Sequence, residues 1–344
     1  MLSKVTRVCL VAACLWAIAD ACWGLEHSWF LYLHRALAPL SFMLFLAVGV
    51  VAFCFESLRR KDIVLVWFLM LVACGAPILR SILCSSPTAT VAEARAPSLR
   101  VLNFNILGHT DRSQQIVDEI ARHQPDIVTL QEVNHELAHA LQKSLLKTYP
   151  CQQLDPAPGS WGMGILAKEL CSAVTFPTND AWVGRPQLVQ VERPGKLPVL
   201  VMNIHAVHPH VYFSPVPCCG RVEGITDTVR ARETSIENLL KTSRNLKSSS
   251  VILAGDLNST MRNTVYEIIR STGMGDSWLE LHGFTSGATW PGREFTGTKL
   301  LEWLLRIDFV FHCAALRPVR ATLLPANLGS DHRGLLVEFS ERPA

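Results

Sequence analysis

Gly255-Asp256-Leu257-Asn258 is the stretch of this 344-residue sequence that most constrains its fold, and Arg306-Ile307-Asp308 and Ser330-Asp331-His332 follow it in order. Each motif adjoins a short apolar run that is typical of a buried strand, at residues 251–254, 309–311 and 335–337 respectively. Sheet enzymes hold reacting carboxylates and amides at strand ends, because the sheet is rigid there while the loops stay open. Three such motifs in order therefore predict a functional site built on the ends of strands.

Strand-like and helix-like segments alternate over residues 99–341. Strands are predicted at residues 99–106, 126–132, 164–167, 188–191, 198–205, 251–256, 307–312 and 335–339, and helices at 113–123, 228–246 and 264–271. In the first helix, apolar residues recur at a spacing of three and four, and Pro125 ends it. Because strands outnumber helices and many apolar runs are short, the sequence predicts a layered sheet sandwich flanked by helices.

Three long apolar segments lie in the first hundred residues, at 8–25, 36–55 and 63–83. The middle segment runs for about 20 residues without a charge, which is enough to cross a hydrocarbon core of ~30 Å. A signal peptide for the first segment and buried core helices for the others are the alternatives. We predict three transmembrane helices in a membrane anchor at residues 1–84, followed by a linker at 85–98 that contains small residues and proline.

Basic residues indicate an orientation for this predicted anchor. Lys4 and Arg7 precede the first segment, and residues 59–61 between the second and third are all basic. The positive-inside rule places both groups in the cytoplasm, although Arg80 and Arg95 oppose this orientation. The expectation is a multi-pass protein of the plasma (inner) membrane with its folded domain on the extracytoplasmic side.

The charge of the folded domain is balanced. The whole chain has 32 Lys and Arg against 29 Asp and Glu, a formal net charge of +3, but from Ser98 onward there are 24 of each. Proteins that hold nucleic acid non-specifically usually carry a basic surplus, because neutralising phosphates supplies that affinity. The balance disfavours tight DNA binding, while a local basic patch stays open.

The cysteines indicate no metal ribbon or redox motif, because none of the eleven has C-x-x-C spacing. In an oxidising compartment Cys151 could pair with Cys171, or a pair could use Cys218 or Cys219. Buried thiols without a disulfide are the alternative, also for Cys313, and the sequence does not choose between them.

Six motifs in this order resemble those of the endonuclease/exonuclease/phosphatase superfamily, which includes deoxyribonuclease I, abasic-site endonucleases, neutral sphingomyelinases and inositol polyphosphate 5-phosphatases. They are Phe104-Asn105-Ile106, Leu130-Gln131-Glu132, Asn203-Ile204-His205 and the three stretches quoted first. The resemblance covers about residues 99–339 and implies that 99–341 is the catalytic domain. It implies an α/β fold, a four-layer sandwich of two packed mixed sheets flanked by helices, and divalent-metal-dependent hydrolysis of phosphoester bonds.

The resemblance also implies a metal site. Glu132 is the expected ligand of Mg²⁺, with Mn²⁺ as a substitute, while Asn105 helps to hold metal or phosphate and Asp331 supports the metal directly or through water. The residue types agree, because Mg²⁺ takes oxygen ligands and needs only one or two carboxylates. Turn capping is the alternative for Asn105, and Asn103 is the less favoured asparagine because it lies within the strand.

The catalytic residues implied by the resemblance are Asp256, which orients or deprotonates the attacking water, and His332, which Asp308 holds in one tautomer. Whether His332 acts as a general base or mainly stabilises the phosphate stays open. Asn258 is expected to contact the phosphate and His205 to donate to a phosphate oxygen. An ordinary turn at 255–258 and a packed core histidine at 205 are the alternatives.

Fewer residues point to the substrate. Arg230, together with Arg232, opens a predicted helix and could hold a phosphate, and Trp290 could stack on a base; a solvated helix face and simple packing are the alternatives. The long loop at 206–226 is expected to wall the site. The spacing of His205, His208 and His210 could suit zinc, but Pro209 breaks any helical face, and the hard-cation site is favoured.

The sequence therefore predicts a membrane-anchored, divalent-metal-dependent phosphoesterase that hydrolyses phosphodiester or phosphomonoester bonds by metal-assisted attack of water. The substrate would be a lipid head group, nucleotide or nucleic acid, the lipid bilayer would be a further partner, and no protein partner can be inferred. An extracytoplasmic nuclease acting on DNA or RNA fits the motifs equally but not the charge. A non-catalytic membrane-tethered binding module would lack site residues, and none is missing.

Overall fold

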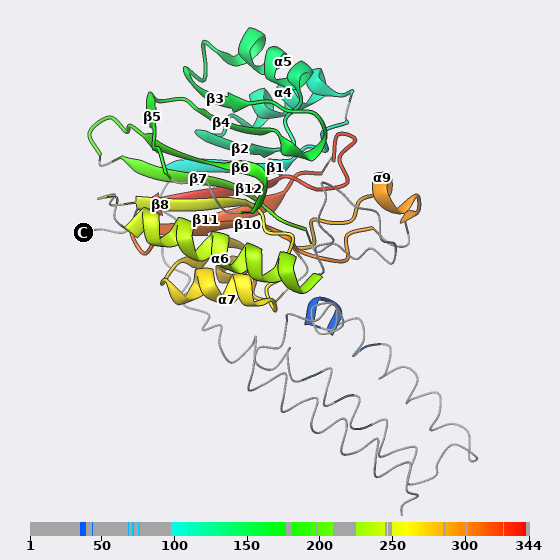
Figure 1. Ribbon diagram of the computed structural model, residues 1–344. Helices are drawn as coiled ribbons and strands as arrows, with labels where there is room; N and C mark the ends of the chain where they lie inside the picture. Colours follow the sequence, from blue (N-terminus) through cyan, green and yellow to red (C-terminus); the bar gives the residue numbers. More distant parts are fainter. Residues whose placement is uncertain are drawn as a thin grey trace, which may run out of the picture. The chain divides into compact units, whose positions relative to one another are not determined.

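The computed structural model describes residues 98–341, except 110, 177–180, 197, 209–224, 245, 247–249, 285–286, 300–301 and 326, together with residues 35–38, 43, 68, 71 and 75. Two six-stranded sheets pack against each other (Figure 1). The first sheet has the order β11-β12-β1-β2-β4-β3, with β1 (Leu99–Asn105), β2 (Ile127–Gln131), β3 (Cys151–Asp155), β4 (Met163–Ala167), β11 (Leu316–Leu323) and β12 (Leu335–Glu341). The second has the order β5-β6-β7-β8-β10-β9, with β5 (Cys171–Ala173), β6 (Trp182–Val191), β7 (Val199–Ala206), β8 (Ser250–Asp256), β9 (Gly275–Asp276) and β10 (Asp308–His312).

Both sheets are mixed. Strands β1 and β2 run parallel in the first sheet, as β7 and β8 do in the second, and the other pairs are antiparallel. Helices α4 (Ser113–His123) and α5 (His135–Leu145) lie on the outer side of the first sheet, and α6 (Ile225–Arg244) and α7 (Thr264–Ser271) on the outer side of the second (Figure 1). The prediction of two mixed sheets flanked by helices is confirmed.

Alternation along the central strands produces two separate apolar cores. In β1, Leu99 and Val101 face the second sheet, whereas Leu102 and Phe104 pack under helices α4 and α5. Successive side chains of a strand point to opposite faces, so a strand buried on both faces reads as a nearly continuous apolar run. The predicted strands were recognised by such runs.

A polar layer interrupts the core between the sheets. Gln131 Nε2 donates to Oδ1 of Asn103 at 2.9 Å and to Oδ1 of Asn203, in the second sheet, at 2.7 Å. Asn203 Nδ2 in turn donates to the carbonyl oxygens of Leu130 and Gly164, both at 3.0 Å. Buried amides need such partners, so this layer fixes how the two sheets lie against each other.

Short elements complete the described fold. They are the 3₁₀ helix η2 (Gly159–Trp161) and the α-helices α8 (Ser277–His282) and α9 (Arg293–Thr296). Asp276 caps α8 by accepting from the backbone N–H groups of Trp278 and Leu279, and Asn134 caps α5 through Leu137 N at 2.8 Å.

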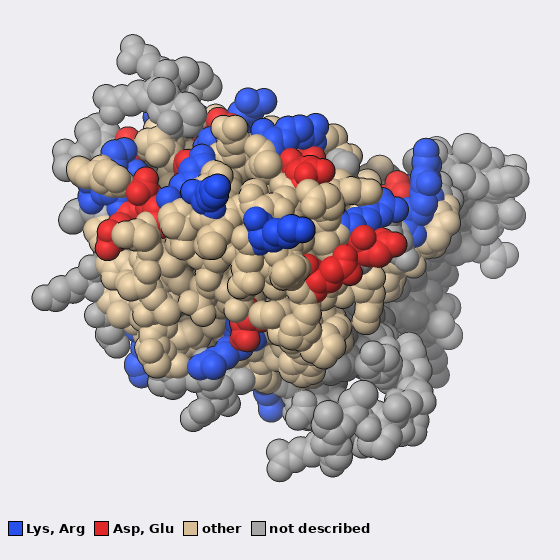
Figure 2. Space-filling view, turned by 90° about the horizontal axis from the view of Figure 1, so that it is seen from above, with Lys and Arg blue, Asp and Glu red and all other residues tan. Residues whose placement is uncertain are grey.

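The surface carries both signs of charge. Figure 2 shows Lys and Arg side chains interspersed with Asp and Glu side chains over the face seen there, and neither sign forms a continuous area on it. This agrees with the equal numbers of acidic and basic residues after Ser98.

The predicted multi-pass localisation in the plasma (inner) membrane, with an extracytoplasmic domain, is contradicted. Within the described part of the chain, no helix is both long and apolar enough to cross a bilayer. The segments that suggested spanning helices, at 8–25, 36–55 and 63–83, fall almost wholly outside the described residues, as does the linker at 85–98. The prediction of spanning helices rested on apolar runs, and signal peptides and buried helices give the same pattern. The predicted bilayer partner has no support either.

A disulfide joins the edges of the two sheets. Cys151 begins β3, the edge strand of the first sheet, and Cys171 begins β5, the edge strand of the second, with their Cα atoms 5.5 Å apart. Cys313 is a partly buried thiol outside this disulfide, and Cys218 and Cys219 lie outside the described residues. The structure thus chooses one of the pairings that the sequence left open.

Removing this disulfide is expected to destabilise the protein. For a sequence separation of 20 residues, the chain-entropy relation gives about 3 kcal/mol of unfolding free energy. Urea denaturation of the Cys151→Ser/Cys171→Ser variant should show that loss, and dithiothreitol should destabilise the wild type but not the variant. Cys313→Ser is the control and should keep the sensitivity to dithiothreitol. A wild-type midpoint that dithiothreitol leaves unchanged would contradict the prediction.

Candidate active site

Side chains from both sheets converge at one edge of the sandwich. The parallel strands bring their carboxyl ends to this edge, and β10 runs antiparallel to β8, so Asp308 at its start pairs directly with Asp256 at the end of β8. His205 of β7 is also in register with Asp256. The buried residues that meet here are Asn105, Glu132, His205, Asp256, Asp308, Asp331 and His332.

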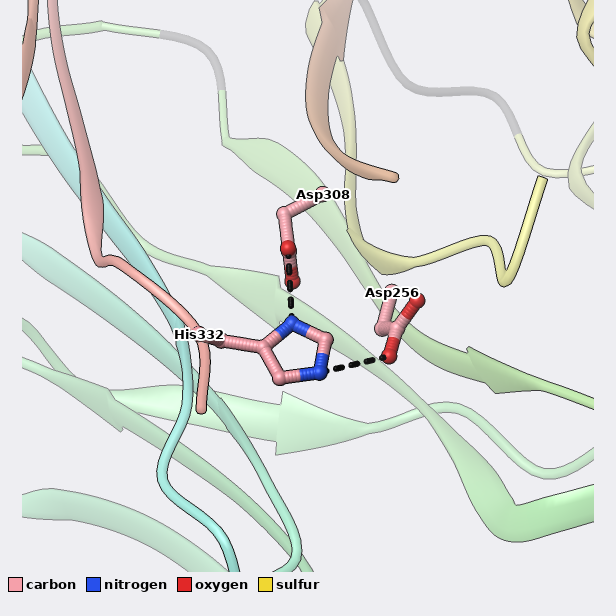
Figure 3. Close-up of side chains that lie close together, drawn as sticks. All are labelled: Asp256, Asp308 and His332. Atoms are coloured by element: carbon pink, nitrogen blue, oxygen red, sulfur yellow. Dashed lines mark hydrogen bonds and ion pairs between the residues drawn. The ribbon is translucent and has the colours of Figure 1, made fainter. Parts of the chain in front are cut away.

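His332 lies between two carboxylates (Figure 3). Its Nδ1 is 2.8 Å from Oδ2 of Asp308, and its Nε2 is 3.7 Å from Oδ2 of Asp256. The backbone also holds it, since its N–H donates to Ser330 Oγ at 2.9 Å and that hydroxyl donates to the carbonyl oxygen of Asn105 at 2.7 Å. The expected contact between Asp308 and His332 is therefore present.

The two histidines of the site have opposite protonation. Burial opposes a charged ring at His332, but the carboxylates of Asp308 and Asp256 outweigh it and raise its pKa to about 10. Burial, and then the neighbouring charge of His332, lowers the pKa of His205 to about 3. At neutral pH His332 is thus an imidazolium and His205 a neutral imidazole.

The carboxyl group of Asp256 has a pKa near neutrality. Burial, and then the charge of Asp308, raises its pKa to about 7, against the opposing effects of His332 and of hydrogen bonds from Asn258 N and Asn105. The hydrogen bond from Asn258 N to Oδ1 is 2.7 Å long and fixes the carboxyl group in the turn after β8. A pKa near neutrality suits a group that exchanges protons.

The amide of Asn105 links a carboxylate of each sheet. Its Nδ2 lies 3.1 Å from Oε1 of Glu132 and 3.1 Å from Oδ2 of Asp256. Its Oδ1 accepts from Leu107 N at 3.2 Å, so Asn105 also caps the turn after β1, the alternative weighed above. Asn103 lies one layer deeper and belongs to the polar layer between the sheets.

Glu132 has a backbone conformation that side-chain-bearing residues rarely adopt, with φ at 64°. Its Oε2 accepts from Gly108 N at 3.0 Å. Gly108 has to be glycine, because a Cβ there would lie 2.0 Å from the carbonyl oxygen of Gly159. Strained positions of this kind cluster at functional sites, where the surrounding structure holds them.

The cluster has the donor set of a hard cation. Oδ1 of Asp308 and Oδ1 of Asp331 are buried and lack a hydrogen-bond partner among the described residues. Asp256, Asp308 and His332 each offer a ligand atom within 4.8 Å of the others, a grouping that differs from the predicted ligands Asn105, Glu132 and Asp331. Buried carboxylate oxygens are costly without a compensating charge, so the carboxylates of this cluster suit a divalent cation with oxygen ligands.

With this geometry in view, comparison with known proteins is informative. The sequence profile of the Endonuclease/Exonuclease/phosphatase family matches residues 102–332. The chain belongs to this family. A comparison with curated proteins gives no match.

Solved structures share the fold of this chain. The 3′ phosphatase NExo from Neisseria superposes with a TM-score of 0.55 at 18% identity, over 71% of this chain and 100% of that one. Humanized D. rerio TDP2 gives 0.53 at 18% identity over 70% and 98%, and the human Nocturnin catalytic domain gives 0.52 at 20% over 73% and 97%. At these identities the likeness shows the fold alone.

The predicted substrate residues have different surroundings. Trp290 donates from Nε1 to Oδ2 of Asp331 at 3.0 Å and its ring lies 4.9 Å from that of Phe295. Asn258 adopts a left-handed backbone with φ at 46° and donates from Nδ2 to the carbonyl oxygen of Ala206 at 3.0 Å. Arg230 is exposed on α6. The predicted loop wall lies mostly outside the described residues, as does His210 of the zinc alternative.

Two arginines named in the sequence analysis make structural contacts. Arg306 forms a bidentate ion pair with Asp276, at 2.9 and 2.7 Å, and Tyr266 donates to the same carboxylate at 2.8 Å. Buried Arg232 donates to the carbonyl oxygens of Val207 and Asn258, which braces the turns after β7 and β8.

Sequence reasoning gave no role to three groups of this family member. Thr289 Oγ1 accepts from the N–H groups of Ile307 and Asp308, both at 3.2 Å, and so positions the start of β10. Gly108 N–H and Ser330 Oγ hold Glu132 and His332 respectively. Ser330 is the first residue of the motif Ser330-Asp331-His332, where a hydroxyl two residues before the histidine was an available signal, whereas Thr289 is 19 residues from Asp308 in the chain.

The contact between Asp308 and His332 predicts strong coupling in a double-mutant cycle. His332→Ala and Asp308→Ala should each lower kcat/KM on phosphoesters by on the order of 10²-fold or more. The double variant should be little worse than the poorer single one, because each substitution disables the same unit. His312, a buried histidine 3.4 Å from Glu280, is the matched control. Its replacement by Ala should combine additively with Asp308→Ala. A double variant that loses the full sum of both effects would refute the pairing.

Proposed function

We propose that residues 99–341 form a divalent-metal-dependent phosphoesterase that hydrolyses phosphodiester or phosphomonoester bonds by attack of water. The observation that carries this proposal is the buried cluster of four carboxylates around one charged and one neutral histidine, at the strand ends of a fold belonging to the Endonuclease/Exonuclease/phosphatase family. A binding module has no need to bury so many like charges, because their repulsion and desolvation cost stability.

Glu132, Asn105 and Asp331 are the proposed holders of the cation, for which we infer Mg²⁺ with Mn²⁺ as a substitute. When bound, such an ion supplies positive charge that offsets the phosphate's charge and lowers the pKa of a water. Glu132 suits this role because each of its oxygens accepts only one hydrogen bond, from Asn105 and from Gly108 N, among the described residues.

Asp256 is the proposed acceptor of the proton of the attacking water. Its pKa of about 7 leaves a sizeable ionised fraction at neutral pH, and Asn258 N and Asn105 Nδ2 fix the orientation of its two oxygens. A base whose pKa lies near the working pH combines ionisation with affinity for the proton.

The two histidines are proposed to bind the phosphate group. Asp308 holds Nδ1–H of His332, which leaves Nε2–H to donate to an oxygen on which negative charge develops. His205 is neutral and can donate a second hydrogen bond without adding charge. Asn258, Trp290 and Arg230 are the proposed substrate contacts around this centre.

Nucleic-acid phosphoesters are the first substrates to examine. NExo from Neisseria is a 3′ phosphatase whose structure is bound to a product DNA hairpin, and D. rerio TDP2 has been solved complexed with single strand DNA product, with a TM-score of 0.51 at 20% identity. These proteins share their fold with this chain, which supports DNA ends as candidates beside nucleotides and lipid head groups.

The proposal predicts metal-dependent hydrolysis that Glu132→Gln abolishes. The full chain should cleave bis(p-nitrophenyl) phosphate, p-nitrophenyl phosphate or a 3′-phosphorylated oligonucleotide with Mg²⁺, and excess EDTA should remove this activity until Mg²⁺ or Mn²⁺ is restored. Glu132→Gln should lower kcat at least ~10²-fold, since it removes a charge at the reacting centre. Thermal unfolding of each variant should show that it is folded.

Glu136→Gln is the matched control, because this glutamate is exposed on α5 four residues further along. Its activity should equal that of the wild type. Turnover that persists in excess chelator would overturn the metal dependence, and absence of turnover on all three substrates would overturn the proposed function.

A further inference from the structure

A polar cavity of about 330 Å³ adjoins the loop that carries His332. Its lining consists of Arg293, Glu302, Trp303, Pro325, Asn327 and Arg333. None of these residues belongs to the motifs recognised in the sequence.

This cavity is built directly onto the candidate active site. Arg333 follows His332 in the chain, and Gly292 N donates to the carbonyl oxygen of Asp331 at 2.6 Å. Gly292 separates Asp331 from the ring of Trp303, because a Cβ there would lie 3.0 Å from both. Arg333 in the cavity wall is therefore continuous with the segment that carries His332, and Gly292 links that segment to the neighbouring loop.

The cavity presents one guanidinium group, that of Arg333, which has no acidic partner among the described residues. Arg333 stacks over Trp303, with its guanidinium carbon 5.2 Å from the ring centroid, and no carboxylate among the described residues lies within ion-pair distance of it. Burial alone lowers its pKa, with no acid opposing that effect. Arg293 donates from Nε to Glu302 at 3.2 Å, and this acid, which also lines the cavity, offsets part of its charge.

These groups suit a phosphate. A guanidinium binds phosphate oxygens through two parallel hydrogen bonds, and stacking on an aromatic ring orients it for that contact. The ring of Trp303 and Cα of Asp331 lie on either side of Gly292, so the cavity adjoins the segment that carries Asp331 and His332. In a nucleotide chain, a phosphate next to the reacting one could occupy such an adjoining site.

Aromatic side chains occur on the segments that line this cavity, and one of them is exposed. Phe295 is 66% exposed and tilted against Trp290, and Trp303 lines the cavity. Aromatic faces beside basic groups bind unpaired bases by stacking, largely regardless of sequence. A lipid head group or a lone phosphomonoester would contact the arginines but not these rings.

We propose that the cavity of Arg293, Trp303 and Arg333 is a second phosphate subsite, which binds the phosphate next to the scissile one in single-stranded nucleic acid. The inference rests on the proposed phosphoesterase function and names its substrate class. Arg333 and Arg293 bind the neighbouring phosphate, and Phe295 and Trp303 offer rings to the unpaired bases.

The kinetic test compares substrates with one and with several phosphates. Arg333→Gln should raise KM for single-stranded oligothymidylate at least tenfold more than KM for bis(p-nitrophenyl) phosphate, since it removes a charge-assisted hydrogen bond. Arg333→Lys should fall between Gln and wild type, because it keeps the charge without the fork. Arg320→Gln, an exposed arginine on β11, is the control and should change neither value. Equal losses on both substrates, or none, would overturn the subsite.

The binding test needs no turnover, so it separates this inference from the proposed function. With EDTA present, fluorescence anisotropy of labelled octathymidylate should show binding to the wild type. The slope of log affinity against log salt concentration should be smaller for Arg333→Gln, by the amount expected for about one phosphate contact. Phe295→Ala should weaken octathymidylate more than it weakens pyrophosphate used as competitor. Equal effects on the two ligands, or a duplex that binds as tightly as the single strand, would overturn the assignment to single strands. Failure of hydrolysis with intact, Arg333-dependent binding would overturn only the proposed catalysis.

Discussion

The side-chain amide of Asn105 makes the contact on which the rest of the site depends. Its Nδ2 reaches one carboxylate from each sheet, Glu132 of the first and Asp256 of the second. A single amide can do this only if β1 ends level with β2 and opposite β8. A slip of one residue in β1 would turn Asn105 toward the helices and bring an apolar neighbour between the carboxylates, because successive side chains alternate between faces. The site therefore requires a fixed relation between the sheets.

The polar layer beneath the site supplies that relation. Asn103 and Asn203 lie two residues before Asn105 and His205, hence on the same strand faces, and Gln131 donates to both asparagines. Leaving a buried amide without its partner costs about 1–3 kcal/mol, so sliding of one sheet over the other is penalised. The disulfide between Cys151 and Cys171 fastens the outer edges of the same two sheets. Apolar contacts between the sheets are non-directional and would not fix the register to this degree.

The fold and the convergence of the site could be predicted because polar residues at the ends of parallel strands meet at one sheet edge. The role of Arg306 could not, although it shares a motif with Asp308, because its partner Asp276 lies 30 residues away in the chain and is brought near by the pairing of β9 with β10. Strand β11 was missed since Pro318 and a register shift interrupt its pattern. Apolar runs before residue 98 led to the incorrect prediction of a multi-pass membrane localisation, because hydropathy alone does not distinguish the structures that an apolar run can form.

The segment 330–333 connects the candidate catalytic residues with the proposed phosphate subsite. Four successive residues make four different attachments: Ser330 Oγ to Asn105 O, Asp331 O to Gly292 N, the His332 ring to Asp308, and Arg333 N to Thr289 O. These attachments reach the end of one sheet, the start of a strand in the other and the loop that carries Trp290. Because the segment is held at every residue, the backbone of Arg333 is fixed relative to the ring of His332. The proposed catalysis needs such a fixed segment, since small displacements of a reacting group cost large factors in rate.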